Sequence, residues 1–219
     1  MKIKAVGFDI DGTMYPDSSM YILSIFAFLK HPVLFNKFGK VRKTIRTIQY
    51  EDDFRSAQAR LLAASLGVSK NDAVDFINRF IYGGLESSFK KIKPFKELRP
   101  VLMSLKESGL HLGAMSDLPV GRKLEYLGVN DLFDFAFSTE DTGFLKPHPV
   151  PFKKMIQEFN LFPEEILYVG NNYRYDVVGA AALGMKTAHL AKKKVQKSQA
   201  DITFSSFLTL RDWIFAINN

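Results

Sequence analysis

The chain has 219 residues, of which 47% are hydrophobic, and its formal net charge is +7. This length and composition allow one sizeable domain, or a domain with an insertion, and argue against a disordered chain. The absence of cysteine excludes disulfides, thiolate zinc sites and cysteine nucleophiles, and it suits a reducing cytoplasm, where we expect the protein.

The first predicted element is a short buried strand over the apolar run Ile3–Phe8. It ends at two carboxylates, Asp9 and Asp11, and Gly12 and Thr13 follow as a turn signal. Ligands of open α/β sheets bind beyond the carboxyl ends of the strands. Buried carboxylates need a partner, which a hard cation such as Mg²⁺ supplies through oxygen ligands. A solvated turn is the alternative reading of these residues.

Residues 17–92 predict an inserted unit of helices without strands. One helix is expected from Asp17, and another runs through Val41–Ile48. A further helix runs through Phe54–Leu62 and stops at Gly67, and the next extends from Ser69 to about Gly83–Gly84. The most apolar stretch, Met20–Leu29, is too short for a membrane span, which needs roughly 20 residues. No signal peptide is expected, because the chain opens on the strand itself.

From Pro94 onward, strands alternate with helices, which favours a parallel sheet covered on both faces. The expected strands are 110–115, 133–137, 166–169, 186–190 and a short one at 202–204. The expected helices are 98–105, 120–127, 152–159, 177–183 and 207–217. Basic residues gather at 37–46 and 192–197. Without a nucleic-acid motif beside them, we expect solvated faces, or a surface that steers phosphorylated anions.

Polar residues follow the later strands as well. Ser116 and Asp117 end the second strand, where a hydroxyl could donate to a phosphoryl oxygen or simply cap a helix. Lys146 is followed by a proline that restrains the backbone; a solvated lysine is the alternative. Asn171 and Asp176 follow the fourth strand.

Together these segments resemble the four motifs of the haloacid dehalogenase-like (HAD) hydrolases, in the family's order. The run from Asp9 to Thr13 resembles the first motif, and Ser116 stands at the Ser/Thr of the second. Residues 143–152 are similar to the Lys-Pro-x-Pro-x-x-Phe form of the third, with Lys146 as its lysine. His148 stands where that motif often has aspartate, and we expect it to be part of the loop rather than a base.

The fourth motif is matched with one departure. Residues 170–180 resemble Gly-Asp-x-x-x-x-Asp-x-x-Gly-Ala, and Asp176 stands at the second acid. Asn171 stands where the family has its first acid. We expect this neutral ligand to weaken magnesium binding without removing the site.

The resemblance implies an α/β fold: a Rossmann-like three-layer core with a parallel sheet and the Asp9 strand at its centre. Residues 1–16 and 93–219 would form this core. Residues 17–92 would be an α-helical cap inserted between the first and second motifs.

The resemblance also implies a magnesium-dependent phosphatase of small phosphate monoesters. Its nucleophile would be Asp9, which forms an aspartyl-phosphate, and its acid/base would be Asp11, with Ser116 and Lys146 completing the catalytic set. The expected substrate-binding residues are Gly12, Thr13, Ser116, Asp117 and Lys146. The expected Mg²⁺ ligands are Asp9, Asp11 through its carbonyl, Asp176 and Asn171.

Alternatives remain open at this point. A phosphomutase shares the motifs, and a catalytically decayed binding protein would explain Asn171. Asp11 argues against a dehalogenase, and no cap lysine is singled out for a phosphonatase.

The expected partner is a small phosphorylated metabolite. No nucleic acid or membrane partner is expected, and the protein would be a monomer or homodimer. Early residues of the insertion could line the substrate side or pack in the core: Tyr15, Met20, Tyr21 and Phe26.

Overall fold

The computed structural model describes residues 2–219, except for the side chains at 21, 23, 24, 26, 27 and 85. The expected roles of Tyr21 and Phe26 therefore fall outside the described residues. Six strands form one sheet: β1 (Ala5–Asp9), β2 (His111–Ser116), β3 (Phe135–Ser138), β4 (Ile166–Gly170), β5 (Lys186–Leu190) and β6 (Ile202–Phe204). The strands lie within about two residues of the predicted ones.

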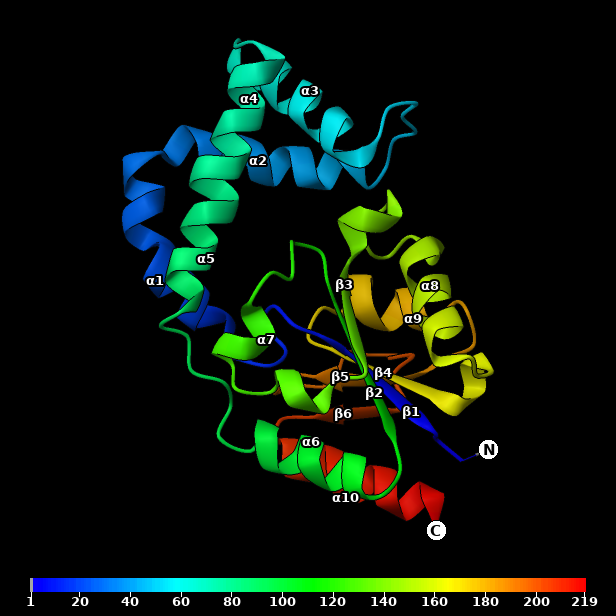
Figure 1. Cartoon of the computed structure of the whole chain (residues 1–219). Helices are drawn as coiled ribbons and strands as arrows, with labels where there is room; N and C mark the ends of the chain where they lie inside the picture. Colours follow the sequence, from blue (N-terminus) through cyan, green and yellow to red (C-terminus); the bar gives the residue numbers. More distant parts are fainter. Residues whose placement is uncertain (1) are drawn as a thin grey trace.

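The sheet is entirely parallel and has the order β3-β2-β1-β4-β5-β6 (Figure 1). β1 pairs with β2 on one side and with β4 on the other, which confirms its predicted central position. Since all strands run the same way, the carboxyl ends of β1, β2 and β4 lie along one edge. Those ends are Asp9, Ser116 and Gly170.

Helices cover both faces of the sheet, so the core has three layers. Val6 and Phe8 point to the face that α6 (Leu98–Glu107) and α10 (Phe207–Asn218) cover, whereas Ala5 points to the opposite face. That opposite face is covered by α8 (Pro149–Phe159) and α9 (Val178–Ala181). Gly7 lets α8 approach, because a Cβ there would lie 2.3 Å from the Met155 sulfur. The predicted Rossmann-like α/β class is confirmed.

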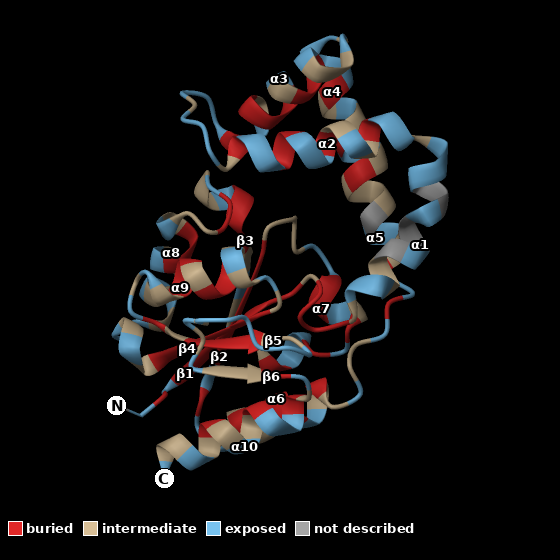
Figure 2. Ribbon diagram, turned by 180° about the vertical axis from the view of Figure 1, so that it is seen from behind, coloured by how far each residue is buried: buried red, intermediate tan, exposed pale blue. Residues whose placement is uncertain are grey.

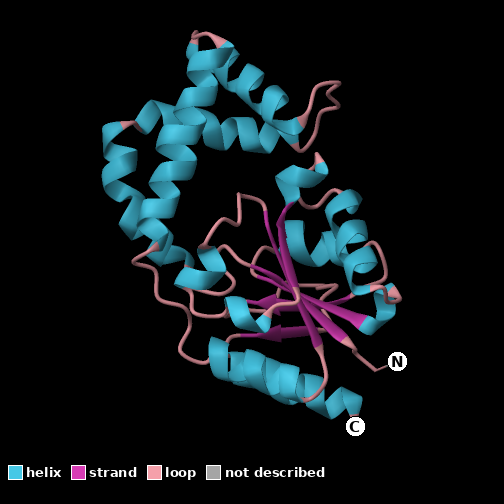
Figure 3. Ribbon diagram, viewed as in Figure 1, coloured by secondary structure: helices cyan, strands magenta, loops and turns pink. Residues whose placement is uncertain are grey.

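The helices of residues 17–89 form a separate unit beside the sheet, called here the helical unit (Figure 3). Its helices are α1 (Asp17–Lys30), α2 (Pro32–Ile45), α3 (Phe54–Leu66), α4 (Lys70–Phe76), a π-helical segment (Ile77–Tyr82) and α5 (Gly83–Phe89). The unit has its own apolar cluster, to which α2, α3 and α4 contribute. Figure 2 shows buried residues on α2, α3 and α4 among exposed ones.

Three predicted helix boundaries were wrong. The helix expected to end near Gly83–Gly84 continues to Phe89, because both glycines keep a negative φ and Phe89 is buried against Tyr15. α2 ends at Ile45, and Ile48 is exposed. The helix expected over 120–127 is one short turn, α7 (Lys123–Tyr126). Among the described residues, no helix is long and apolar enough to cross a membrane.

Candidate active site

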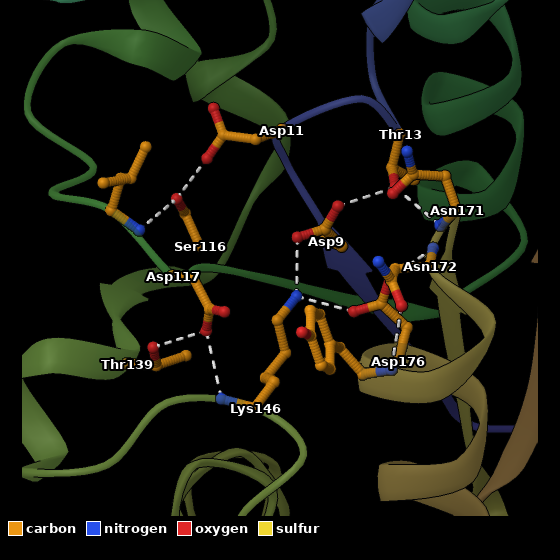
Figure 4. A network of polar contacts seen from close by, with 12 residues as sticks. Asp9, Asp11, Thr13, Ser116, Asp117, Thr139, Lys146, Asn171, Asn172 and Asp176 are labelled. Atoms are coloured by element: carbon orange, nitrogen blue, oxygen red, sulfur yellow. Dashed lines mark hydrogen bonds and ion pairs between the residues drawn. The ribbon is translucent and has the colours of Figure 1, made fainter. Parts of the chain in front are cut away.

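Three buried charged side chains meet at the edge where β1 and β4 end. The Lys146 ammonium lies 2.6 Å from Asp9 Oδ1 and 2.6 Å from Asp176 Oδ1 (Figure 4). Its third contact is a hydrogen bond of 3.2 Å to the Tyr168 hydroxyl. Asp9, Lys146 and Asp176 are each less than 5% exposed. Two ionised carboxylates and one ammonium would give this buried site a net negative charge.

The surroundings of Asp9 favour its neutral form in part. Burial raises the pKa of Asp9 to about 7, and the negative charges of Asp176 and Asp11 act in the same direction. Lys146 has the opposite effect and lowers this pKa. The pKa of Lys146 is raised well above its usual value by the two carboxylates, despite its burial. A further positive charge beside Asp9 would therefore stabilise its carboxylate form.

Asp176 reaches this site because β4 ends in a glycine. A Cβ at Gly170 would lie 2.3 Å from the Asp176 carboxyl carbon. The Asp176 carboxylate also accepts a hydrogen bond of 2.9 Å from the Asn172 backbone N–H. Gly170 and Asp176 both belong to the segment that resembles the fourth motif, and the missing Cβ of the glycine leaves room for the acid.

Asp11 points to a different group of donors. Its carboxylate oxygens lie 2.9 and 2.7 Å from the Lys123 ammonium. It also accepts a 2.8 Å hydrogen bond from the Tyr15 hydroxyl and a further one from the Ser116 hydroxyl. Burial alone would raise the pKa of Asp11, but Lys123 and the two hydroxyls outweigh it, so the pKa lies below its usual value. These donors favour the carboxylate form of Asp11.

Thr13 and Asn171 lie on the other side of Asp9. The Thr13 hydroxyl donates to Asp9 Oδ2 at 2.7 Å, and the Asn171 backbone N–H donates to the same hydroxyl at 3.0 Å. The Asn171 side-chain oxygen lies 3.3 Å from it. The Thr13 hydroxyl therefore links Asn171 to the Asp9 carboxylate. Gly12 has φ +84°, a left-handed conformation that suits glycine at this turn.

Asp117 joins the core to the helical unit. Its carboxylate accepts hydrogen bonds from Thr139 Oγ1 at 2.7 Å and from the Lys146 backbone N–H at 3.1 Å. Arg46, the C-cap residue of α2, binds the other oxygen at 2.5 Å. Burial opposes ionisation of Asp117, but Lys146, Arg46 and Arg42 lower its pKa below the usual value. Its side chain holds the Lys146 loop in place.

The basic cluster of the sequence is partly buried, contrary to the expected solvated face. Arg42 lies on the inner side of α2, where it binds Glu140, the Gln58 side chain and the Asp117 carbonyl. Arg46, one turn later, donates to the Lys146 carbonyl at 2.9 Å. The spacing of these two arginines marks one helix face. The four lysines at 192–197 are exposed, as expected.

Sequence reasoning missed Lys123, Arg42 and Arg46 as site residues. The position of Lys123 in the sequence was one indication of its role, because it follows Ser116 by only seven residues, at the same edge of the sheet. His148 is the N-cap of α8 and stacks on Phe144, in agreement with its expected place in loop structure.

The oxygen atoms around Asp9 suit a hard cation that keeps part of its water. The carboxylates of Asp9 and Asp176 share the Lys146 ammonium, and the Asn171 amide oxygen lies 3.3 Å from the Thr13 hydroxyl that donates to Asp9. No cluster of three or more acidic or histidine side chains over the described chain is arranged to hold a metal by itself. Mg²⁺ is commonly held by only one or two carboxylates, together with water and substrate phosphate. The donor set therefore fits magnesium.

Curated relatives of the chain are phosphatases. It is 29% identical to the glyceraldehyde 3-phosphate phosphatase of Methanopyrus kandleri, with 89% of this chain and 86% of the relative covered. It is 26% identical to the pyrophosphatase PpaX of Bacillus anthracis, with 86% and 83% covered. These relatives agree with the expected class of enzyme, a phosphoric monoester hydrolase.

Solved structures share the fold along the whole chain. The L-2-haloacid dehalogenase of Xanthobacter autotrophicus, solved with covalently bound chloropropionic acid, superposes with a TM-score of 0.72 at 18% identity, covering 98% of this chain and 99% of that one. A HAD phosphatase from Thermococcus onnurineus gives 0.66 at 24% identity, with 98% of both chains covered.

A family comparison settles the class to which the motifs point. The sequence model of the haloacid dehalogenase-like hydrolases matches residues 3–184, which include every residue of the site described above. The chain belongs to the haloacid dehalogenase-like hydrolases.

Proposed function

We propose that the chain is a magnesium-dependent hydrolase of small phosphate monoesters that works through an aspartyl-phosphate on Asp9. The observation that carries this proposal is the buried Asp9 carboxylate at the end of the central strand, paired with Lys146 at 2.6 Å. The names of the relatives, which act on glyceraldehyde 3-phosphate or pyrophosphate, support a compact phosphorylated metabolite as the substrate.

Asp9 is oriented for attack by its neighbours. Lys146 holds one carboxylate oxygen and Thr13 holds the other. In the first step, an Asp9 oxygen forms a bond to phosphorus while the bond from phosphorus to the leaving oxygen breaks. The electron pair of that bond goes to the leaving oxygen, which takes a proton from Asp11. Lys146 offsets the charge on the transferring phosphoryl group.

Asp11 serves as acid and then as base. The negative charge of an arriving phosphate raises its pKa, which opposes the effect of Lys123 and favours the protonated form needed first. In the second step, the Asp11 carboxylate takes a proton from water, whose oxygen attacks phosphorus and displaces Asp9. Lys123 favours the ionised form that this step requires.

The phosphoryl oxygens have several donors at the same edge. The Ser116 hydroxyl, which now donates to Asp11, would turn to one oxygen, and backbone amides at Gly12 and Asp117 would serve others. Bound Mg²⁺ would reduce the repulsion between the nucleophile and the phosphate. The residues that would hold it are Asp9, Asp176, Asn171 and Asp11 through its carbonyl.

Residues 17–92, which include the helical unit, would act as the cap. A cavity of about 80 Å³ lies between α5 and the loop after β2, with Phe89 and Tyr82 on one wall and Pro119 and Lys123 on the other. Lys123 connects this cavity to Asp11. A leaving group placed there would be small, and the cap would exclude water around it.

The test is phosphate release from a panel of phosphorylated metabolites, with MgCl₂ or with EDTA. The proposal predicts release that depends on magnesium and is abolished in Asp9→Asn, a variant of the same shape. If the parent protein releases phosphate equally well in EDTA, or if Asp9→Asn keeps most of the activity, the proposed mechanism is wrong.

A further inference from the structure

The one departure from the family motif, Asn171, is paired with an acid from a different part of the chain. Asn171 Nδ2 donates a hydrogen bond of 3.0 Å to Asp17 Oδ2, at the start of α1. The oxygen end of the same amide lies 3.3 Å from Thr13 Oγ1, which donates to Asp9. The two ends of the Asn171 side chain therefore face two different groups. Figure 4 shows Asn171 beside Thr13, whose hydroxyl is joined to Asp9.

The backbone between the catalytic acid and this pair is packed closely against it. A Cβ at Gly12 would lie 1.8 Å from Asp17 Oδ1 and 2.4 Å from Asn171 Nδ2. Gly12 directly follows Asp11, whose carbonyl is one of the magnesium donors proposed above. The Asp17 carboxylate thus lies against the same turn that carries this carbonyl.

Charge explains why Asn171 and Asp17 belong together. An aspartate at 171 would place two carboxylates within hydrogen-bonding distance, which disfavours the ionisation of both. With asparagine at 171, the pair keeps one negative charge, now carried by Asp17. The amide also supplies a donor to Asp17, which an aspartate at 171 could not do in its ionised form.

We propose that Asp17 is a positioning residue of the cation site: it supplies the negative charge that Asn171 lacks and turns the Asn171 oxygen toward the cation. This inference rests on the magnesium site of the proposed function. Partners that orient a ligand typically account for tenfold or more in metal affinity. Asp17 would act from outside the ligand set.

The test is titration of the whole protein with MgCl₂. Binding is measured by calorimetry and by the rise in unfolding temperature. Asp17→Asn should weaken magnesium binding by about tenfold or more. The exchange variant Asp17→Asn/Asn171→Asp keeps the charge of the pair and should restore most of the affinity. The control Asp75→Asn, which removes an exposed acid from α4, should bind magnesium as the parent does.

The result that overturns the inference is an Asp17→Asn protein that binds magnesium with the parent's affinity. An exchange variant that binds no better than Asp17→Asn overturns it as well. Asp17→Glu, which keeps the charge, should fall between the parent and Asp17→Asn. Unfolding temperatures in EDTA report whether each variant is folded.

The same titration separates this inference from the proposed function. If the parent binds magnesium and releases phosphate, but Asp17→Asn binds equally well, only the role of Asp17 fails. If the parent neither binds magnesium nor releases phosphate with it, the proposed function fails and the inference fails with it.

Discussion

Lys146 is central to the site because it balances two buried carboxylates that would otherwise repel each other. Its ammonium lies 2.6 Å from both Asp9 and Asp176. Removal of Lys146 would leave both carboxylates without their counter-charge, and an uncompensated buried charge costs about 3–5 kcal/mol. Lys146 is therefore expected to matter for stability as well as for chemistry.

The contact between Lys123 and Asp11 leads to a prediction about how activity depends on pH. It lowers the pKa of Asp11, so Lys123→Met should raise that pKa. A base is active only when ionised, so the acidic limb of the profile of kcat against pH should move to higher pH. Lys123→Arg keeps the charge and should leave the limb near its original place. The measurement is kcat from pH 4 to 8 (about the range over which a carboxyl with a perturbed pKa titrates).

An acidic limb that does not move in a folded Lys123→Met protein would show that Lys123 does not control Asp11. A limb that moves equally in Lys123→Arg would assign the effect to packing rather than to charge.

At the scale of single residues, the site residues that follow strands could be predicted from the sequence. Those that contact the site from distant parts of the chain could not. Asp9, Ser116 and Asp176 each lie at or just after a predicted strand, and parallel strands bring such ends to one edge. Lys123 meets Asp11 across 112 positions, and Arg42 meets Glu140 across 98. Neither contact leaves a local pattern, because it depends on how α7 and α2 pack.

At the scale of the element, α2 attaches the helical unit to the core. Arg42 and Arg46 lie one turn apart and both face Asp117, through its carbonyl and its carboxylate. Their contacts explain why a cluster of basic residues on an amphipathic helix is not merely a solvated face. The Arg46 guanidinium also lies 4.5 Å from the Tyr175 ring, next to Asp176.

The buried Arg42–Glu140 pair is expected to stabilise the folded protein. Glu140 is fully buried in its side chain, and Tyr82 is its other partner at 2.8 Å. Arg42→Met should lower the free energy of unfolding by about 3–5 kcal/mol, because it leaves Glu140 without its counter-charge. Urea unfolding measures it, and Arg42→Met/Glu140→Gln should recover part of the loss.

The matched control is Arg55→Met. Arg55 pairs with Asp141 between α3 and the segment that also contains Glu140, but both side chains are more than half exposed. Exposed pairs contribute about 0–1 kcal/mol. Equal losses in the Arg42 and Arg55 variants would contradict the buried role of Arg42.

Element boundaries were harder to predict than element types. Gly83 and Gly84 signal a helix end, yet both keep right-handed helical geometry because the helix continues to the buried Phe89. Tertiary packing outweighs the weak preference of glycine in such a case, about 1 kcal/mol per residue. The strands were predicted well, because each is a short apolar run ended by polar residues.

At the scale of the whole molecule, the core and the helical unit meet over Asp117, and this contact predicts a response to acid. The pKa of Asp117 is lowered in the folded protein, so its ionised form contributes stability above the unfolded value of about 3.9. That contribution is lost as the pH falls through the folded pKa. Asp117→Asn should therefore be less stable than the parent at pH 7.

The difference in the free energy of unfolding between the parent and Asp117→Asn should shrink steadily below about pH 4. Urea unfolding of both proteins at a series of pH values measures it. A difference that stays constant from neutral to strongly acidic pH would show that the charge of Asp117 does not stabilise the fold.

The central claim is that Asp9 carries the phosphoryl group during turnover, and its most direct test is to isolate that intermediate. The parent protein is mixed with magnesium and a substrate from the panel, quenched in acid within the first turnover, digested and analysed by mass spectrometry. We predict one added phosphoryl group on the peptide that contains Asp9, removed by hydroxylamine and absent in Asp9→Asn. Phosphate release in the first turnover without any phosphorylated Asp9 peptide would contradict the account.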